Sequence, residues 1–234
     1  MKRNNFQIIS VSHVNKRFGE KQILSDVSFS VNRGEVFGIL GKNGAGKTVL
    51  INTLLGLIKP DKGEIKVFGM DLETNLTPIR QRVNLAASYQ NLQTQATIKD
   101  NLSLFAGLYG VNRPQEKIDR LLLQFGILEL AKKNKKLYHL SSGENTKVML
   151  CKALINNPDI LYLDEPTAYL DPLSRDQIIK MIKLLIKKRQ TTFVYTSHNL
   201  EEITKLCHRV LVLRQGKISY IGKIPPRAEL MGYY

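Results

Sequence analysis

The sequence predicts an α/β protein that begins with an antiparallel β element and carries an inserted helical subdomain. Strand-like patterns at 8–14 and 23–31 are separated by the turn Phe18-Gly19-Glu20, and they precede the first βα unit. A buried strand pattern returns at 160–163, after a long stretch with helical spacing. We therefore expect a single domain with one core made from two stretches of chain. The expected core is 1–87 with 158–234, and the expected subdomain is about 88–157.

The helical stretch contains its own start and stop signals. Thr97 is expected to cap a helix that ends at Gly110, and a second helix is expected from near Pro114 to Gly126. After the core resumes, Pro225-Pro226 is expected to end the ordered pattern and leave a short tail.

Composition fits a soluble globular chain. Of the 234 residues, 43% are hydrophobic and 24% are charged, and no apolar run approaches the roughly 18 residues of a membrane span. The start, residues 1–6, lacks a stretch apolar enough for a secretory signal. Cys151 and Cys207 have neither zinc nor disulfide-framework spacing, so a reducing cytoplasm is the expected compartment.

The chain is strongly basic, with a formal net charge of +15. Nucleic acid, an anionic membrane surface or a nucleotide could each profit from this charge. The densest basic run is 132–136, and a solvated helix end or loop explains it. No aromatic interleaving supports base stacking, so nucleic acid is not an expected partner.

A glycine-rich loop joins the apolar strand pattern 36–40 to a helix pattern at 48–57. Its G-x-x-x-x-G-K-T spacing is typical of a phosphate-binding loop, whose glycines let successive N–H groups point at phosphate oxygens. The helix N-terminus adds a positive partial charge. Lys47 is expected to reach the β- and γ-phosphates, and the Thr48 hydroxyl to ligate Mg²⁺. The expected nucleotide-binding residues here are Gly41, Lys42, Asn43, Gly44, Ala45, Gly46, Lys47 and Thr48.

Two carboxylates, Asp164 and Glu165, follow the apolar strand pattern 160–163. Parallel α/β sheets place their ligands at such strand ends. Asp164 is expected to hold Mg²⁺ beside Thr48, and Glu165 to orient or deprotonate an attacking water. The alternative is a pair of exposed carboxylates in a loop.

The segment Leu140-Ser141-Ser142-Gly143-Glu144 opens another helix pattern. Ordinary helix capping explains this segment by itself. The alternative is a second anion site, with Ser141 and Gly143 aimed at a γ-phosphate. If this helix start cannot reach the phosphate loop of its own chain, the two must pair across two chains.

Over nearly its whole length the chain resembles the ATP-binding-cassette (ABC) ATPases, P-loop NTPases with a RecA-like core. The family's motifs occur here in family order. They are the Walker A loop at 41–48, the signature at 140–144, Walker B at 162–167, the D-loop at 168–171 and a switch histidine after Thr196-Ser197. The resemblance implies two cassettes that sandwich two ATP molecules. Each ATP is bound by the Walker motifs of one cassette and the signature residues of the other, here Ser141, Ser142, Gly143 and Glu144.

The resemblance also implies roles for single residues. Phe18 is similar to the aromatic that stacks on adenine, and Asp171 to the aspartate that communicates across the dimer. His198 is similar to the histidine that bonds the γ-phosphate and ties it to the catalytic carboxylate. Gln90 is similar to the Q-loop glutamine, which contacts Mg²⁺ and the attacking water and senses the membrane partner. Gln93 and Gln95 remain alternatives to Gln90, because this segment is shorter than the family pattern.

The chain departs from the family pattern at four positions. Ser142 and Glu144 replace Gly and Gln of the usual L-S-G-G-Q signature, Val49 replaces a common second hydroxyl residue, and His208 stands where Asp is usual. None of these changes removes a catalytic group, so active hydrolysis is expected.

The resemblance implies an ATP-hydrolysing subunit that works with a separate transmembrane permease, as a homodimer or heterodimer of cassettes. Its location would be cytoplasmic and peripheral, on the inner face of the cell membrane. The signature and the segment 197–202 resemble export-type cassettes that pair with ABC-2 permeases. One alternative is a soluble ABC ATPase acting on nucleic acid or ribosomes, although those relatives usually carry long insertions or two cassettes. A plain P-loop kinase or GTPase would leave the signature and His198 unexplained.

Overall fold

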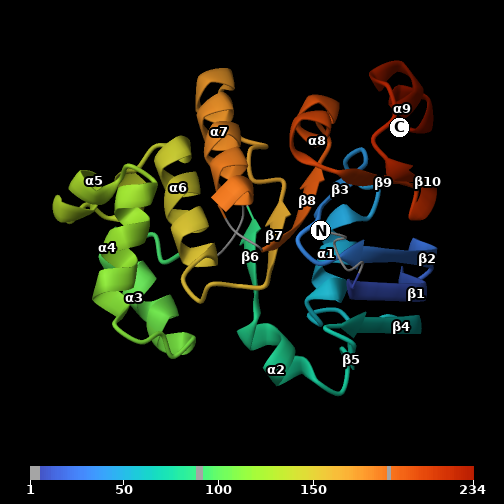
Figure 1. The fold of residues 1–234 in the computed structure, drawn as a ribbon, viewed down its shortest axis with the longest axis horizontal. Coiled ribbons are helices and arrows are strands. Elements are labelled where there is room, and N and C mark those ends of the chain that lie inside the picture. Colours follow the sequence, from blue (N-terminus) through green and yellow to red (C-terminus); the bar gives the residue numbers. More distant parts are fainter. Residues whose placement is uncertain (1–5, 88–91, 189–190) are drawn as a thin grey trace. The chain divides into compact units, whose positions relative to one another are not determined.

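The computed structural model describes residues 6–87, 92–188 and 191–234. The chain forms two compact units, both coloured along the sequence in Figure 1. The first unit consists of 1–80 and 190–234, and the second of 81–189.

An antiparallel sheet opens the first unit, as the sequence predicts (Figure 1). Its strands pair in the order β2-β1-β4-β5. On β2 the side chains of Val27, Phe29 and Val31 are buried and that of Ser28 is exposed. The alternating sequence pattern therefore reflects one buried and one exposed face of the strand. The strands are β1 (Gln7–Phe18), β2 (Lys21–Asn32), β4 (Lys62–Val67) and β5 (Met70–Asp71).

Four more strands of the first unit pair in the order β10-β9-β3-β8. All five residues of β3 are buried, and β3 runs parallel to β8 on one side and to β9 on the other. A strand buried on both faces reads as a continuous apolar run, which explains the pattern 36–40. The elements are β3 (Val36–Leu40), α1 (Lys47–Leu54), β8 (Thr192–Ser197), α8 (Leu200–Leu206), β9 (Arg209–Arg214) and β10 (Lys217–Lys223).

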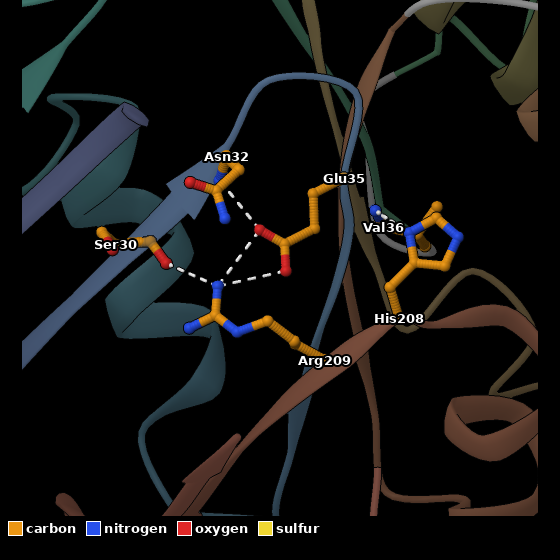
Figure 2. Close-up of polar contacts among 6 residues, drawn as sticks. All are labelled: Ser30, Asn32, Glu35, Val36, His208 and Arg209. Atoms are coloured by element: carbon orange, nitrogen blue, oxygen red, sulfur yellow. Dashed lines mark hydrogen bonds and ion pairs between the residues drawn. The ribbon is translucent and has the colours of Figure 1, made fainter. Parts of the chain in front are cut away.

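A buried carboxylate fixes the start of β3, as Figure 2 shows. Glu35 accepts hydrogen bonds from Arg209 Nη1 at 3.1 and 3.2 Å and from the Asn32 N–H at 2.8 Å. His208 Nδ1 accepts the Val36 N–H at 3.1 Å. His208, which stands where the family usually has Asp, therefore holds the chain before β9 against β3.

The second unit contains one parallel pair of strands and most of the helices (Figure 1). Thr97 caps α3 in a capping box with Asp100, and Pro114 lies in the first turn of α4, so both predicted helix starts are confirmed. The helix α2 (Leu76–Gln81) contains the point in the sequence at which the first unit ends and the second begins. The elements of the second unit are β6 (Val83–Ala87), α3 (Ile98–Leu108), α4 (Pro114–Gln124), α5 (Leu128–Lys132), a 3₁₀ turn (Leu137–His139), α6 (Ser142–Ala153), β7 (Ile160–Asp164) and α7 (Pro172–Lys188).

The prediction that Pro225-Pro226 ends the ordered pattern is wrong. Pro226 instead precedes the helix α9 (Arg227–Tyr233). Proline suits a helix start because its φ is fixed near the helical value. The helix is held by the fully buried side chain of Leu230 and by Ser219 Oγ, which donates to the Tyr233 carbonyl at 2.9 Å. Tertiary packing therefore orders a segment whose local signals point to a tail.

Within the described part of the chain, no helix combines the length and the apolar character that a membrane span requires.

A buried ammonium group lies inside the second unit. Lys152 on α6 donates to the Leu85 carbonyl at 3.1 Å, and its Nζ lies 5.0 Å from the centroid of the Phe105 ring. Burial disfavours the charged form and lowers the pKa of Lys152 from 10.5 to about 8.

This pKa shift predicts a pH-dependent stability. Because the folded-state pKa lies below the unfolded value, the charged lysine destabilises the fold below pH 8, and this cost fades as pH rises to 10.5. Relative to Lys152→Met, the wild type should therefore gain about 3 kcal/mol of unfolding free energy across this window. Urea unfolding at several pH values measures the difference. The exposed Lys135→Met is the control, and a pH-independent difference for Lys152→Met would contradict the prediction.

Candidate functional site

The glycine-rich loop lies between β3 and α1, and neighbouring backbone leaves no room for side chains at two of its glycines. A Cβ on Gly41 would lie 2.6 Å from the Leu213 carbonyl oxygen, and one on Gly46 would lie 2.9 Å from the Ile23 carbonyl oxygen. Gly46 also has a φ of 105°, which L side chains rarely adopt. Close packing against β9 and β2 therefore requires glycine at these two positions.

Lys47 is the first residue of α1 and is buried, with 5% of its surface exposed. Its Nζ donates to the carbonyl oxygens of Gly41 at 2.6 Å and Lys42 at 3.1 Å. The ammonium group therefore lies across the loop, at the N-terminus of a helix, where the positive end of the helix dipole adds to its charge. Lys42, Asn43, Gly44 and Thr48 are exposed and Ala45 is buried, so the loop offers an open, positively charged surface to an anion.

His198 comes to the same end of the sheet as this loop. It is exposed and directly follows β8, whose Ser197 is paired with Leu40 of β3. The Gly41 N–H donates to the Ser197 carbonyl at 3.3 Å. The structure thus brings together the phosphate loop and the predicted switch histidine.

The buried carboxylate of Glu202 supports the backbone before His198. It accepts hydrogen bonds from Ser197 Oγ at 2.8 Å and from the Tyr195 hydroxyl at 2.9 Å. Ser197 Oγ in turn accepts the Asn199 N–H at 2.9 Å. Sequence reasoning missed this supporting role, and its only signal is the acidic pair in the first turn of α8.

Phe18 ends β1 and is 50% exposed, with Lys16 Nζ 5.5 Å from its ring centroid. An exposed aromatic ring of this kind is available for stacking.

The two predicted catalytic carboxylates lie at the end of β7 in the second unit. Asp164 is the last residue of the strand and is buried, whereas Glu165 is half-buried. Glu165 has a φ of 46°, an unusual conformation for a residue with a side chain. Other described residues, among them His13 and Asp26, also have a positive φ, so this conformation does not by itself mark a functional residue.

The signature segment forms a capping box at the start of α6. Ser141 Oγ accepts the Glu144 N–H at 3.2 Å, and the Glu144 carboxylate accepts the Ser141 N–H at 2.8 Å. Ser141 and Ser142 are exposed. A Cβ on Gly143 would lie 3.2 Å from Ser174 Oγ, so a side chain there would crowd the start of α7.

Asp171 also has a local structural role. It precedes α7 and accepts the N–H groups of Leu173 and Ser174, both at 3.0 Å. Hydrogen bonds from the Ser174 side chain and backbone hold the pKa of Asp171 below its usual value. The carboxylate is therefore ionised and caps the helix.

The predicted site residues are divided between the two units. The phosphate loop, Phe18 and His198 belong to the first, and Asp164, Glu165, Asp171 and the signature belong to the second. Gln90 lies outside the described residues. Of its two alternatives, the exposed Gln93 donates its N–H to Asn101 Oδ1 at 2.7 Å, and Gln95 is also exposed.

Known proteins are similar to this chain in sequence and in fold. The family model for ABC transporters matches residues 24–168. The Nod factor export ATP-binding protein I of Bradyrhizobium diazoefficiens is 40% identical over 209 residues, which cover 89% of this chain and 68% of that protein. The same protein of Rhizobium etli is 37% identical over 89% of this chain and 66% of its own length.

The solved structures that resemble this chain belong to the same family. CbiO1 of Clostridium perfringens, part of an ABC transporter complex, has a TM-score of 0.82 at 25% identity, over 97% of this chain and 91% of that chain. A dimeric ATP-binding cassette bound to ADP and phosphate has a TM-score of 0.81 at 25% identity, over 93% and 99%. The RecA-like fold class predicted from the motifs is confirmed. The chain therefore belongs to the ABC transporter family, as an ATP-binding subunit that hydrolyses ATP.

Proposed function

We propose that this chain drives export through a separate membrane permease, by ATP-dependent closure of a dimer of cassettes. The observation that carries the proposal is the buried ammonium group of Lys47, which bonds the Gly41 carbonyl across the phosphate loop. The same chain also carries the signature segment at the start of the helix α6. The direction of transport is supported by relatives that are named as export ATP-binding proteins. A dimer is supported by the related cassette that was solved as one.

In this proposal the phosphate loop holds the β- and γ-phosphates, with Lys47 moving its hydrogen bonds from loop carbonyls to phosphate oxygens. Phe18 stacks on the adenine ring. The signature residues Ser141, Ser142, Gly143 and Glu144 of a second cassette close over the γ-phosphate, and Asp171 lies near the contact between cassettes.

Thr48 and Asp164 offer oxygen ligands of the kind that Mg²⁺ prefers, and Gln90 would add a third. Among the described residues no cluster of three metal-binding side chains occurs, and Mg²⁺ usually takes only one or two protein ligands beside phosphates and water. The donor set therefore fits this ion, which when bound neutralises charge on the β- and γ-phosphates.

Glu165 accepts a proton from the attacking water, and His198 donates a hydrogen bond to the γ-phosphate. The proton leaves the water as its oxygen bonds to the γ-phosphorus, and ADP leaves from the opposite side. The products, ADP and phosphate, hold the two cassettes together more weakly than ATP does, so the dimer reopens.

The coupling surface in this proposal lies on the helical subdomain, about 88–157, while 1–87 with 158–234 forms the core. Leu104 and Leu108 lie four residues apart on α3, with 50% and 72% of their surfaces exposed. Neighbouring exposed leucines on one helix suit contact with a permease. The chain would then lie on the cytoplasmic face of the membrane, held there by its partner.

Replacement of Lys47 by alanine should weaken ATP binding by about tenfold to a hundredfold, because a charge-assisted hydrogen bond is lost. Titration with a fluorescent ATP analogue measures the affinity. The exposed Lys62→Ala on β4 is the matched control, with unchanged affinity expected. Normal ATP binding and hydrolysis by Lys47→Ala would overturn the site.

Replacement of Glu165 by glutamine should lower ATP turnover by about a hundredfold or more while ATP binding is kept, because the general base is lost. Phosphate release measures turnover, and size-exclusion chromatography with ATP should show more dimer than for the wild type. Asp176→Asn, an exposed carboxylate on α7, is the control. Unchanged hydrolysis by Glu165→Gln would remove the role given to this residue.

A further inference from the structure

We propose that Tyr234 is a positioning residue for ATP hydrolysis, which holds the backbone of His198 and the side chain of Lys42. This inference rests on the role proposed above for His198. The Tyr234 hydroxyl donates to the His198 carbonyl at 2.8 Å, and Lys42 Nζ lies 5.6 Å from the centroid of the Tyr234 ring. One half-buried side chain thus contacts both the phosphate loop and the residue that would bond the γ-phosphate.

Tyr234 is presented by an ordered element of the first unit. It directly follows α9, whose Leu230 is fully buried and whose Tyr233 ring stacks on Tyr220 of β10 at 4.7 Å. The Ser219 hydroxyl donates to the Tyr233 carbonyl at 2.9 Å. These contacts fix the backbone on the N-terminal side of Tyr234, so its ring reaches Lys42 and His198 from a docked helix.

The Tyr234 hydroxyl also supports the backbone around His198. On the N-terminal side of His198, Ser197 bonds Gly41 through its carbonyl and Glu202 through its hydroxyl. The His198 carbonyl is held by Tyr234. The peptide groups on both sides of the exposed imidazole therefore have partners, which limits the positions that the ring can take.

The aromatic ring of Tyr234 has an effect that is separate from that of its hydroxyl. The face of a phenol attracts an ammonium group, and Lys42 is an exposed residue of the phosphate loop. Tyr234→Phe keeps this face and loses the hydrogen bond to His198, whereas Tyr234→Ala loses both. The two variants therefore separate placement of His198 from placement of Lys42.

The test is steady-state ATP hydrolysis by the full chain, with melting temperature measured alongside. Tyr234→Phe should lower kcat by about twofold to tenfold, the factor that one hydrogen bond supports, with KM for ATP unchanged. Tyr234→Ala should lower kcat similarly and also raise KM. Tyr233→Phe is the matched control on the same helix, because its hydroxyl bonds Glu229 rather than the site, and it should behave as the wild type.

Two outcomes would overturn the inference. One is a normal kcat for Tyr234→Phe, and the other is an equal loss in Tyr233→Phe, which would indicate general damage to α9. His198→Ala tests the underlying proposal separately. If His198→Ala hydrolyses ATP normally, the role of His198 fails. If His198→Ala is inactive and Tyr234→Phe is normal, only the role of Tyr234 fails.

Discussion

The first unit depends on the close approach of three backbone segments to the loop that ends β3. The Leu213 carbonyl lies against Gly41, the Ile23 carbonyl lies against Gly46, and the Gly216 N–H donates to the Ala45 carbonyl at 3.1 Å. These three contacts therefore constrain the conformation of the loop. Its carbonyls face Lys47, whose buried ammonium would be costly without these partners. Tertiary packing thus holds the loop in a shape that suits phosphate.

The division of the site residues has a chemical consequence. The glycine-rich loop and His198 belong to the first unit, whereas the carboxylate proposed as general base and the signature belong to the second. Positioning of the attacking water against the phosphorus contributes strongly to phosphoryl transfer, so the function proposed above requires groups from both units.

Local signals predicted much of the fold. The buried strand 36–40 is confirmed because a continuous apolar run is a local pattern, and the Thr97 cap is confirmed because cap chemistry acts over a few residues. The helix α9 was missed because it depends on contacts with β10 that no local pattern reveals. The roles of Glu202 and His208 were missed for the same reason, since both partners of each contact must be known.

The signature departure Glu144 illustrates how a local interaction decides the chemistry of a substitution. A carboxylate near a γ-phosphate would repel it if its charge faced the ligand. In this structure the Glu144 carboxylate turns back to accept the Ser141 N–H, and Ser141 Oγ accepts the Glu144 N–H. The negative charge also lies at the N-terminus of α6, where the helix dipole stabilises it. The capping box therefore gives glutamate a favourable structural position at the start of α6.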